Sequence, residues 1–335
     1  MRIDKISLIV SVYNEEQGLE TFFRETSRWL RSLSREYELL FINDGSADGS
    51  AAVLDRLLEA DREHVRVIEF SRNFGHEAAM TAGLDYASGD ALVFMDADLQ
   101  HPPALLPQIL KKMDEGFDIV SMVRTKNETA GLIKNITSGA FYKLVNKMSD
   151  MHLEPSASDF FAIDRQVAEV LRHHYRETVR FLRGYVQNVG FRKTTLDYEA
   201  APRAAGHSHY SLRKLWKLST DTIVCFSNLP LKLGIYAGLF SGLLGIALIV
   251  YTLITRDGAP SGYATIVIVL CFMFAMLFLV VGVTGEYISV MFNELKDRPI
   301  YIIRDMKGGT ETAEKMKEKV IENQTGSRKI AEKNA

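Results

Sequence analysis

The chain has 335 residues, of which 47% are hydrophobic and 24% are charged, and its formal net charge is −2. The length exceeds what one ordinary domain needs, and the near-neutral balance argues against a nucleic-acid-binding protein, because such proteins usually carry a basic excess. The sequence contains 2 cysteines, so neither a disulfide framework nor a cysteine-based metal site is expected.

The first 125 residues alternate short β-rich runs with helical patterns. Strands are predicted at residues 6–12, 37–42, 65–70, 91–95 and 118–123, and helices at 17–33, 50–62, 76–87 and 104–115. This alternation predicts an α/β fold with a mostly parallel sheet covered by helices on both faces. Helices dominate the pattern from about residue 132 to residue 192, and a further strand is predicted at 191–198.

Polar side chains follow three of these predicted strands. In chain order they are Asn14, Glu15 and Glu16; Asn43, Asp44 and Asp48; and Asp96, Asp98 and Gln100. Ligands of such folds bind at the carboxyl ends of the strands, so the three groups are expected to converge on one cleft. Clustered carboxylates repel each other unless a cation joins them. The alternative for each of these side chains is a turn or a helix cap.

Asp98 and Gln100 fall on the same side of an extended segment, because side chains alternate with a period of two. We therefore predict that they are the ligands of a Mg²⁺ or Mn²⁺ ion, since hard divalent cations prefer oxygen ligands. Such an ion neutralises the charge that grows on a departing nucleoside diphosphate. Asp44 suits the hydrogen-bond donors of a base or a ribose.

Two uncharged apolar runs, residues 235–254 and 264–283, lie in the C-terminal part. Each is about as long as a helix needs to cross roughly 30 Å of hydrocarbon; the alternative is a pair of buried core helices. Basic residues flank the pair on both outer sides, which places both ends in the cytoplasm by the positive-inside rule.

These patterns divide the chain into four parts. We predict a cytoplasmic catalytic domain over residues 1–205, an interfacial amphipathic helix over 206–232, a two-helix transmembrane hairpin over 233–292, and a cytoplasmic C-terminal segment over 293–335. The alternative for the segment 206–232 is a surface helix packed on the catalytic domain. The tail after Asp305 is rich in charged and small residues, so we predict that it is disordered.

Six segments together carry a resemblance to a known family: "VSVYNEE", "NDGSADGS", "RNFGHEAAM", "SDFFAIDRQV", "RFLRG" and "AGHSHYSLRKL". They resemble family 2 glycosyltransferases of the GT-A fold. More narrowly, they are similar to the polyprenyl-phosphate glycosyltransferases, which include bactoprenol glucosyltransferases and dolichyl-phosphate mannose synthase. The likeness runs from about residue 5 to residue 304.

The resemblance implies an inverting, membrane-bound enzyme that moves glucose from UDP-glucose onto undecaprenyl phosphate, for export and modification of the cell envelope. UDP-N-acetylglucosamine, UDP-galactose and an aminoarabinose donor stay open as alternatives. The implied setting is the bacterial inner membrane, with two spans and a homo-oligomer such as a tetramer. A processive polysaccharide synthase is disfavoured, because neither Trp29 nor Trp216 lies in a Q-x-x-R-W motif. A non-catalytic membrane scaffold is disfavoured by the intact D-A-D-x-Q.

The resemblance also implies site residues. The nucleotide sugar would be bound by Val12, Tyr13, Glu15, Asp44, Asp96 and Arg124. The catalytic residues would be Asp96, Asp98 and Asp159, with Asp98 and Gln100 as metal ligands. The acceptor phosphate would be met by Arg180, Arg183 and His209, although Arg180 and Arg183 also suit an exposed helix with surface ion pairs.

Asp159 matches the position that the family assigns to a catalytic base. The second pKa of a phosphate monoester is about 6, so the acceptor is already mostly a dianion at neutral pH. We therefore expect Asp159 to orient a group or position the metal. His76 is left open between a functional residue and a plain N-terminal helix residue.

Three positions depart from the family pattern. Asn43 replaces an acidic residue, so a carboxylate is missing beside the nucleotide pocket. His209 replaces a basic residue, which makes a phosphate contact there pH-dependent. Lys126 stands where a second arginine is frequent, and it offers a point charge in place of a bidentate fork.

Overall fold

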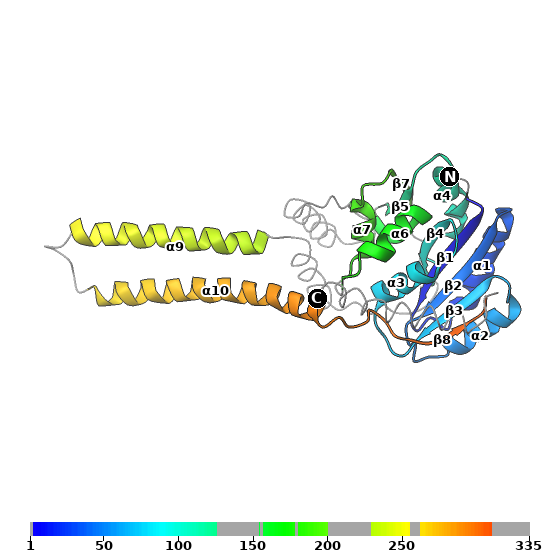
Figure 1. Cartoon of the computed structure of the whole chain (residues 1–335), viewed down its shortest axis with the longest axis horizontal. Helices are drawn as coiled ribbons and strands as arrows, with labels where there is room; N and C mark the ends of the chain where they lie inside the picture. The colour runs from blue at the N-terminus through cyan, green and yellow to red at the C-terminus, as the bar shows by residue number, and fades with distance from the viewer. Residues whose placement is uncertain are drawn as a thin grey trace, which may run out of the picture. The chain divides into compact units, whose positions relative to one another are not determined.

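The structure is a computed structural model, and it describes residues 3–125, 154, 157–177, 180–199, 229–254 and 262–309. The chain divides into two units (Figure 1). The first unit comprises Met1–Tyr142, His152–His209 and Pro299–Ala335, and the second comprises Lys143–Met151 and Tyr210–Arg298. Most of the predicted amphipathic segment 206–232, together with His209 and Lys126, lies outside the described residues.

The first unit is built on an eight-stranded sheet with the order β7-β5-β6-β4-β1-β2-β3-β8. The strands are β1 (Lys5–Val12), β2 (Glu36–Asn43), β3 (Val65–Phe70), β4 (Ala91–Asp96), β5 (Ile119–Arg124), β6 (Ala157–Asp164), β7 (Lys193–Tyr198) and β8 (Ile303–Lys307). β6 and β8 run antiparallel to their neighbours, whereas the other neighbouring pairs are parallel. The predicted mostly parallel α/β sheet is therefore confirmed, with two antiparallel additions.

The strand β6 corrects the sequence analysis, which assigned helices to this stretch. Its central residues Phe160–Ile163 are all buried. A strand buried on both faces shows no polar–apolar alternation, so a short apolar run of this kind is indistinguishable from part of a buried helix. The helices α6 (Arg165–His174) and α7 (Leu182–Asn188) follow it as predicted.

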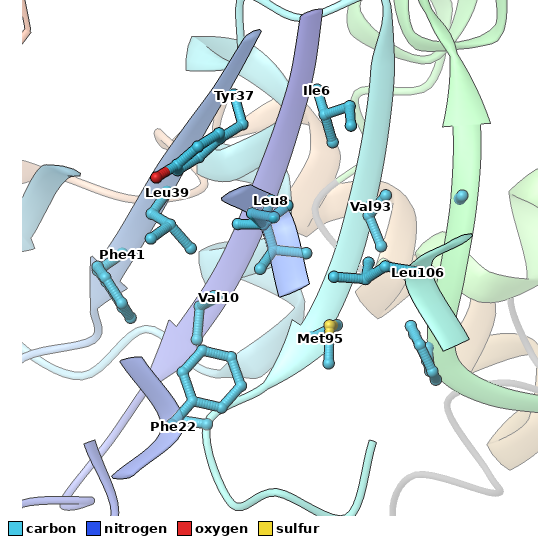
Figure 2. Packing of buried hydrophobic residues seen from close by; sticks show 14 of the residues in the cluster. Ile6, Leu8, Val10, Phe22, Tyr37, Leu39, Phe41, Val93, Met95 and Leu106 are labelled. Atoms are coloured by element: carbon cyan, nitrogen blue, oxygen red, sulfur yellow. The ribbon is translucent and has the colours of Figure 1, made fainter. Parts of the chain in front are cut away.

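Helices cover both faces of the sheet (Figure 1). One face carries α1 (Leu19–Ser32), α2 (Ser50–Ala60), the 3₁₀ turn η1 (Pro103–Leu105) and α4 (Leu106–Asp114). Figure 2 shows this side of the core, where Phe22 of α1 and Leu106 of α4 meet inward-facing side chains such as Leu8 and Val10 of β1. Full burial of each such side chain contributes on the order of 1.5–3 kcal/mol.

The opposite face carries α3 (His76–Tyr86), α6 and α7. α3 lies directly on β1 at Gly83, where a Cβ atom would come within 2.1 Å of the Ile9 Cγ2 atom. Because Gly83 has no side chain, the helix axis can approach the sheet closely. This contact fixes where α3 runs, and therefore where its first residue, His76, is presented.

β8 completes the sheet at the β3 edge. It pairs antiparallel with β3, with Ile68 opposite Met306. Just before β8, the Tyr301 ring stacks on Phe70 with centroids 5.2 Å apart, and its hydroxyl donates a hydrogen bond to Asp85 Oδ2 at 2.6 Å. The prediction of disorder directly after Asp305 is wrong for Met306 and Lys307, because they form the end of β8. The strand covers an otherwise open sheet edge.

The second unit contains two long apolar helices, α9 (Leu229–Ile254) and α10 (Tyr263–Leu295), which pack against each other. Many of their described apolar side chains are exposed, including Leu243 at 68% and Phe278 at 69%. The buried-core alternative therefore does not hold for these side chains.

Within the described residues, one segment, Phe272–Leu295, is long and apolar enough to cross a membrane, and Leu233–Ala247 forms a shorter apolar helix. Exposed apolar surface of this extent is typical of membrane contact. The fold prediction is thus confirmed for one long apolar helix, and the second predicted span stays a prediction.

Candidate active site

The polar groups that follow β1 and β2 largely serve the local backbone. Glu16 Oε2 accepts a hydrogen bond from Gly49 N at 3.0 Å, and Asp48 Oδ1 accepts one from Ser50 N at 3.0 Å. Asn43 Oδ1 accepts one from Ser46 N at 3.1 Å. These contacts complete the turn and the start of α2, where the first helical N–H groups have no partner inside the helix. The turn or cap alternative therefore describes all three side chains.

Asp44 is buried, with 3% of its surface exposed, and it holds the loop that precedes α3. Its Oδ1 accepts from Phe74 N at 2.6 Å, and its Oδ2 accepts from Gly75 N and from Asn73 Nδ2, each at 2.9 Å. Burial raises the pKa of Asp44, although these hydrogen bonds oppose the rise. The contact of Asp44 with a base or ribose stays a prediction.

Gly75 fixes the point at which α3 begins. Its φ of 102° lies in the left-handed region, which a residue with a Cβ adopts only with strain. The hydrogen bond from Gly75 N to Asp44 holds this conformation. The next residue, His76, is therefore presented at the carboxyl edge of the sheet by a rigid turn.

Asp96 and Asp159 are brought together by the antiparallel pairing of β4 and β6. Phe94 pairs with Phe161, so continuing the register by two residues sets Asp96 opposite Asp159. Asp96 ends β4, whereas Asp159 lies near the start of β6. The two residues thus reach the same edge of the sheet because β6 runs in the reverse direction.

His76 lies between these two carboxylates. Its Nε2 is 3.7 Å from Asp159 Oδ2, and its Nδ1 is 3.8 Å from Asp96 Oδ1. The same Nδ1 is 2.9 Å from the Ser11 hydroxyl, which donates to Asp96 Oδ1 at 3.3 Å. The side chains of His76 and Asp159 are 31% and 29% exposed, so the cluster is open to a ligand. Sequence reasoning left the role of His76 undecided.

Arg183, the second residue of α7, completes the cluster. Its Nη1 is 3.3 Å from Asp159 Oδ1. Burial acts to raise the pKa of Asp159, but the positive charge of Arg183, followed by His76, outweighs burial and holds that pKa below its usual range. For His76, burial acts to lower the pKa, but Asp96 and then Asp159 outweigh it and raise the pKa.

Glu77 ties α3 to α7. Its Oε2 accepts a hydrogen bond from Leu182 N at 2.8 Å, at the first residue of α7 and one residue before Arg183. Burial, assisted by the negative charge of Asp159, raises the pKa of Glu77 to about 7. The first two residues of α3 therefore act on both sides of the Arg183–Asp159 pair. His76 contacts Asp159, and Glu77 contacts Leu182 at the start of α7, next to Arg183.

His101 supports Asp96 from the other side. Asp96 N donates a hydrogen bond to His101 Nδ1 at 3.0 Å, so that nitrogen carries no proton and the ring holds its proton on Nε2. Nε2 is 3.8 Å from Asp96 Oδ2. The ring also stacks on Phe160 of β6, with centroids 5.1 Å apart. Sequence reasoning assigned His101 no role, and its only signal was its place after the D-x-D turn.

Asp98, Gln100 and Arg124 form a second group. Asp98 Oδ1 accepts a hydrogen bond from Gln100 N at 3.0 Å, and Gln100 Oε1 accepts one from Arg124 Nη2 at 3.3 Å. The predicted ligand pair and the predicted nucleotide-binding arginine are thus neighbours. One carboxylate and one amide oxygen fit a Mg²⁺ ion that keeps several waters and binds substrate phosphates. Among the described residues, no group of three or more His, Cys, Asp or Glu could hold a metal ion.

The other residues predicted to bind the nucleotide or the acceptor phosphate have surroundings of their own. Tyr13 is 42% exposed just after β1, whereas Val12 is fully buried and the Glu15 backbone N donates to Ser50 Oγ. Arg180 is buried, and its guanidinium donates to the Tyr175 carbonyl at 2.7 Å. The cluster around Asp159 thus gains Arg183, while the hydrogen bonds of Arg180 go to main-chain carbonyls.

Comparison with known proteins gives two family matches. A model of glycosyl transferase family 2 matches residues 7–172, and a model described as the GtrB C-terminal hairpin matches residues 229–291. The second match covers α9 and most of α10.

Similar proteins extend over most of the chain. An uncharacterized glycosyltransferase of Bacillus subtilis, YkcC, is 38% identical over 90% of this chain and 94% of its own length. The bactoprenol glucosyl transferase of Shigella phage SfII is 37% identical over 91% of this chain and 99% of its own. Glucosyl-3-phosphoglycerate synthase of Mycobacterium tuberculosis, solved with Mn²⁺, UDP and phosphoglyceric acid, is 20% identical with a TM-score of 0.46, covering 66% of this chain and 76% of that one.

Proposed function

Since the chain belongs to glycosyl transferase family 2, we propose that it transfers glucose from UDP-glucose to bactoprenol phosphate. The observation that carries the proposal is a likeness that includes the hairpin. A bactoprenol glucosyl transferase is 37% identical over 91% of the chain, and the GtrB hairpin model matches residues 229–291. An enzyme with a membrane-bound acceptor needs both a transfer site and an element that keeps the site at the membrane.

In the proposed reaction, an oxygen of the lipid phosphate attacks C1 of the sugar. The bond between C1 and the diphosphate oxygen breaks, and the nucleoside diphosphate leaves with the electron pair. Direct displacement inverts C1, so an α-linked donor gives a β-linked product. Asp98, Gln100 and Arg124 are neighbours. Asp98 and Gln100 would hold a Mg²⁺ or Mn²⁺ ion, which would neutralise the charge on the leaving diphosphate, and Arg124 would bind that diphosphate.

The cluster around Asp159 serves the acceptor. The lipid phosphate is mostly a dianion at neutral pH, because its second pKa is about 6, so it needs no base. Asp159 is also poorly suited to act as one, because Arg183 contacts one of its oxygens and His76 faces the other. We assign Asp159 the role of orienting Arg183, whose positive charge suits the acceptor phosphate.

The nucleotide is assigned to Val12, Tyr13, Glu15, Asp44 and Asp96, and the acceptor side also includes Arg180 and His209. Exposed apolar side chains on α9 and α10 support membrane association. The finer assignments are two spans in a bacterial plasma membrane, a catalytic unit and both termini on the cytoplasmic side, and a homo-oligomer such as a tetramer. The cytoplasmic placement of the termini is supported by the basic residues that flank the hairpin.

The proposal is tested on the full chain purified in detergent. The protein is incubated with Mg²⁺, bactoprenol phosphate and one radiolabelled UDP- or GDP-sugar at a time, and label is counted in the organic phase. We expect label from UDP-glucose, reduced at least about 100-fold in Asp98→Ala because the leaving charge is no longer neutralised. Asp114→Ala is the matched control, since this carboxylate pairs with Arg35 on the surface.

Each other outcome identifies a different error. Label from UDP-N-acetylglucosamine, UDP-galactose or an aminoarabinose donor alone would contradict the sugar assignment and keep the reaction. Release of UDP without labelled lipid would contradict the acceptor. No transfer from any donor, in protein with a cooperative thermal transition, would favour the non-catalytic scaffold.

A further inference from the structure

We infer that His76 is a positioning residue of the transfer site, which holds Asp159 and Asp96 together as a doubly protonated ring and thereby keeps Arg183 in place for the acceptor phosphate. The inference rests on the proposed function for the reaction that it serves. The proposed mechanism uses Asp96, Asp159 and Arg183 but leaves open what holds two carboxylates side by side.

The Ser11 hydroxyl lies between His76 Nδ1 and Asp96. A serine hydroxyl has one proton, and the Ser11 hydroxyl donates it to Asp96 Oδ1 at 3.3 Å. The Ser11 Oγ atom also lies 2.9 Å from His76 Nδ1. Because the Ser11 proton is directed to Asp96, Oγ is left to accept a hydrogen bond from an N–H at Nδ1. Ser11 thus links the ring to Asp96 by hydrogen bonds.

The other ring nitrogen of His76, Nε2, faces Asp159. His76 Nε2 is buried and has no hydrogen-bond partner among the described residues, but Asp159 Oδ2 lies 3.7 Å away. An N–H at Nε2 pointing to a carboxylate is favourable, whereas a lone pair there would face negative charge. With a proton on both nitrogens, the ring donates toward both carboxylates.

More negative than positive side chains act on the His76 ring. Asp96 of β4, Asp159 of β6 and Glu77 of α3 favour the charged ring, while Arg183 of α7 opposes it. Burial also opposes it, yet the carboxylates outweigh both, so the pKa of His76 is raised. Ser11 of β1, whose hydroxyl lies 2.9 Å from Nδ1, is neutral.

Asp159 connects the His76 ring to Arg183. Asp159 has two oxygens, and each faces a cation: Oδ1 is 3.3 Å from Arg183 Nη1, and Oδ2 is 3.7 Å from His76 Nε2. The two contacts together fix the carboxylate plane. Without His76, Asp159 is held on one side only and is repelled by Asp96, so it turns and Arg183 moves with it.

The test compares the full-length wild type with His76→Gln and with the control His173→Gln. His173 is a suitable control because its side chain is 71% exposed on α6, beside Glu169. We measure kcat, and KM for UDP-glucose, between pH 6 and pH 9.5. We expect His76→Gln to lower kcat about 10- to 100-fold, as loss of a supporting contact does, with KM changed less than threefold. Wild-type kcat should fall on the alkaline side, because the ring loses its second proton there. This fall should disappear in His76→Gln and persist in His173→Gln.

A His76→Gln variant with wild-type kcat and an unchanged alkaline fall would overturn the inference. So would a lower thermal midpoint accompanied by a wild-type pH profile, since that result describes a plain helix residue.

A second measurement needs neither turnover nor a folded His76→Gln variant. The histidine rings are labelled with ¹⁵N, and their titrations are followed by NMR in wild type and Asp159→Asn. We expect one ring to titrate above the ordinary value of about 6.5 and to fall by roughly one pH unit in Asp159→Asn. No such ring would overturn the inference. Because the titration does not depend on the substrate, it decides the role of His76 even if the wild type transfers no sugar and the proposed function fails.

Discussion

The carboxyl end of β2 and the paired ends of β4 and β6 contain the same kinds of side chain and use them differently. After β2, the carboxylates of Asp44 and Asp48 accept hydrogen bonds from backbone N–H groups. Where β4 meets β6, Asp96 and Asp159 face the rings and guanidinium of other side chains. The first region closes turns and begins helices, while the second gathers charge that the backbone does not neutralise.

The comparison shows that position at a strand end does not by itself make an acid functional. Backbone partners are supplied by the local fold and hold a carboxylate whether or not a substrate binds. Cationic side-chain partners come from distant segments, here α3 and α7, and they build an electrostatic site. A substitution of Asp96 or Asp159 in the second region should therefore change activity, and a substitution of Asp48 in the first region should change stability.

The largest effect is expected for Asp159→Asn. An amide binds Arg183 and His76 less strongly than a carboxylate does, so the cation that meets the acceptor phosphate is misplaced. We expect kcat to fall about 100-fold or more at every pH from 6 to 9, as for the loss of an electrostatic contact to the reacting group. The measurement is labelled lipid formed at saturating donor. Recovery of activity at high pH would instead show that Asp159 is a general base.

A smaller effect, on stability, is expected for Glu77→Gln. The pKa of Glu77 is raised to about 7 in the folded protein, so the native state holds a proton that the unfolded chain has released. Stability from this group is therefore lost as pH rises from about 4.5 toward 7 and above. The glutamine variant does not titrate, so its thermal midpoint relative to wild type should rise between pH 5 and pH 8. A difference that is constant with pH would contradict the assignment.

The smallest effect is expected for Asp48→Ala, in the region after β2. The change removes the hydrogen bond from Ser50 N at the start of α2 and should cost roughly 0.5–1 kcal/mol of stability. Activity should stay within twofold of wild type. Chemical unfolding and the labelled-lipid assay measure the two quantities. A large loss of activity at unchanged stability would remove the distinction between the two regions.

Local patterns predicted the part of the fold that is regular. The apolar runs of β1 to β5 and the polar turns after them gave the central strands within about two residues, because parallel strands and their helices have strong local signals. β6 was missed because its central residues Phe160–Ile163 are apolar and buried on both faces, which leaves no strand periodicity in the sequence. β8 was missed because Asp305 and Lys307 look like a charged tail, and their partner β3 is distant in the sequence.

The candidate site was predictable where its residues are close in the chain. Asp98 and Gln100 are two residues apart, and Arg124 was added through the family resemblance. The role of His76 depends on Asp159, which reaches the site only through the reversed direction of β6. No local signal reports a contact between residues so far apart, so the sequence left His76 undecided.

The position of β8 has a consequence for how the protein is made. β3 leaves the ribosome early, but the strand that covers its edge is translated only after both hairpin helices. The sheet therefore stays incomplete until both hairpin helices have been translated. A protein truncated before Ile303 would keep the edge of β3 open to pairing with another chain and would be prone to aggregation. A soluble version of the catalytic unit should accordingly carry Pro299–Gly309 joined back to the first 199 residues, rather than end where the hairpin begins. The linker must be long enough to cross the sheet, because β7 and β8 lie at its opposite edges.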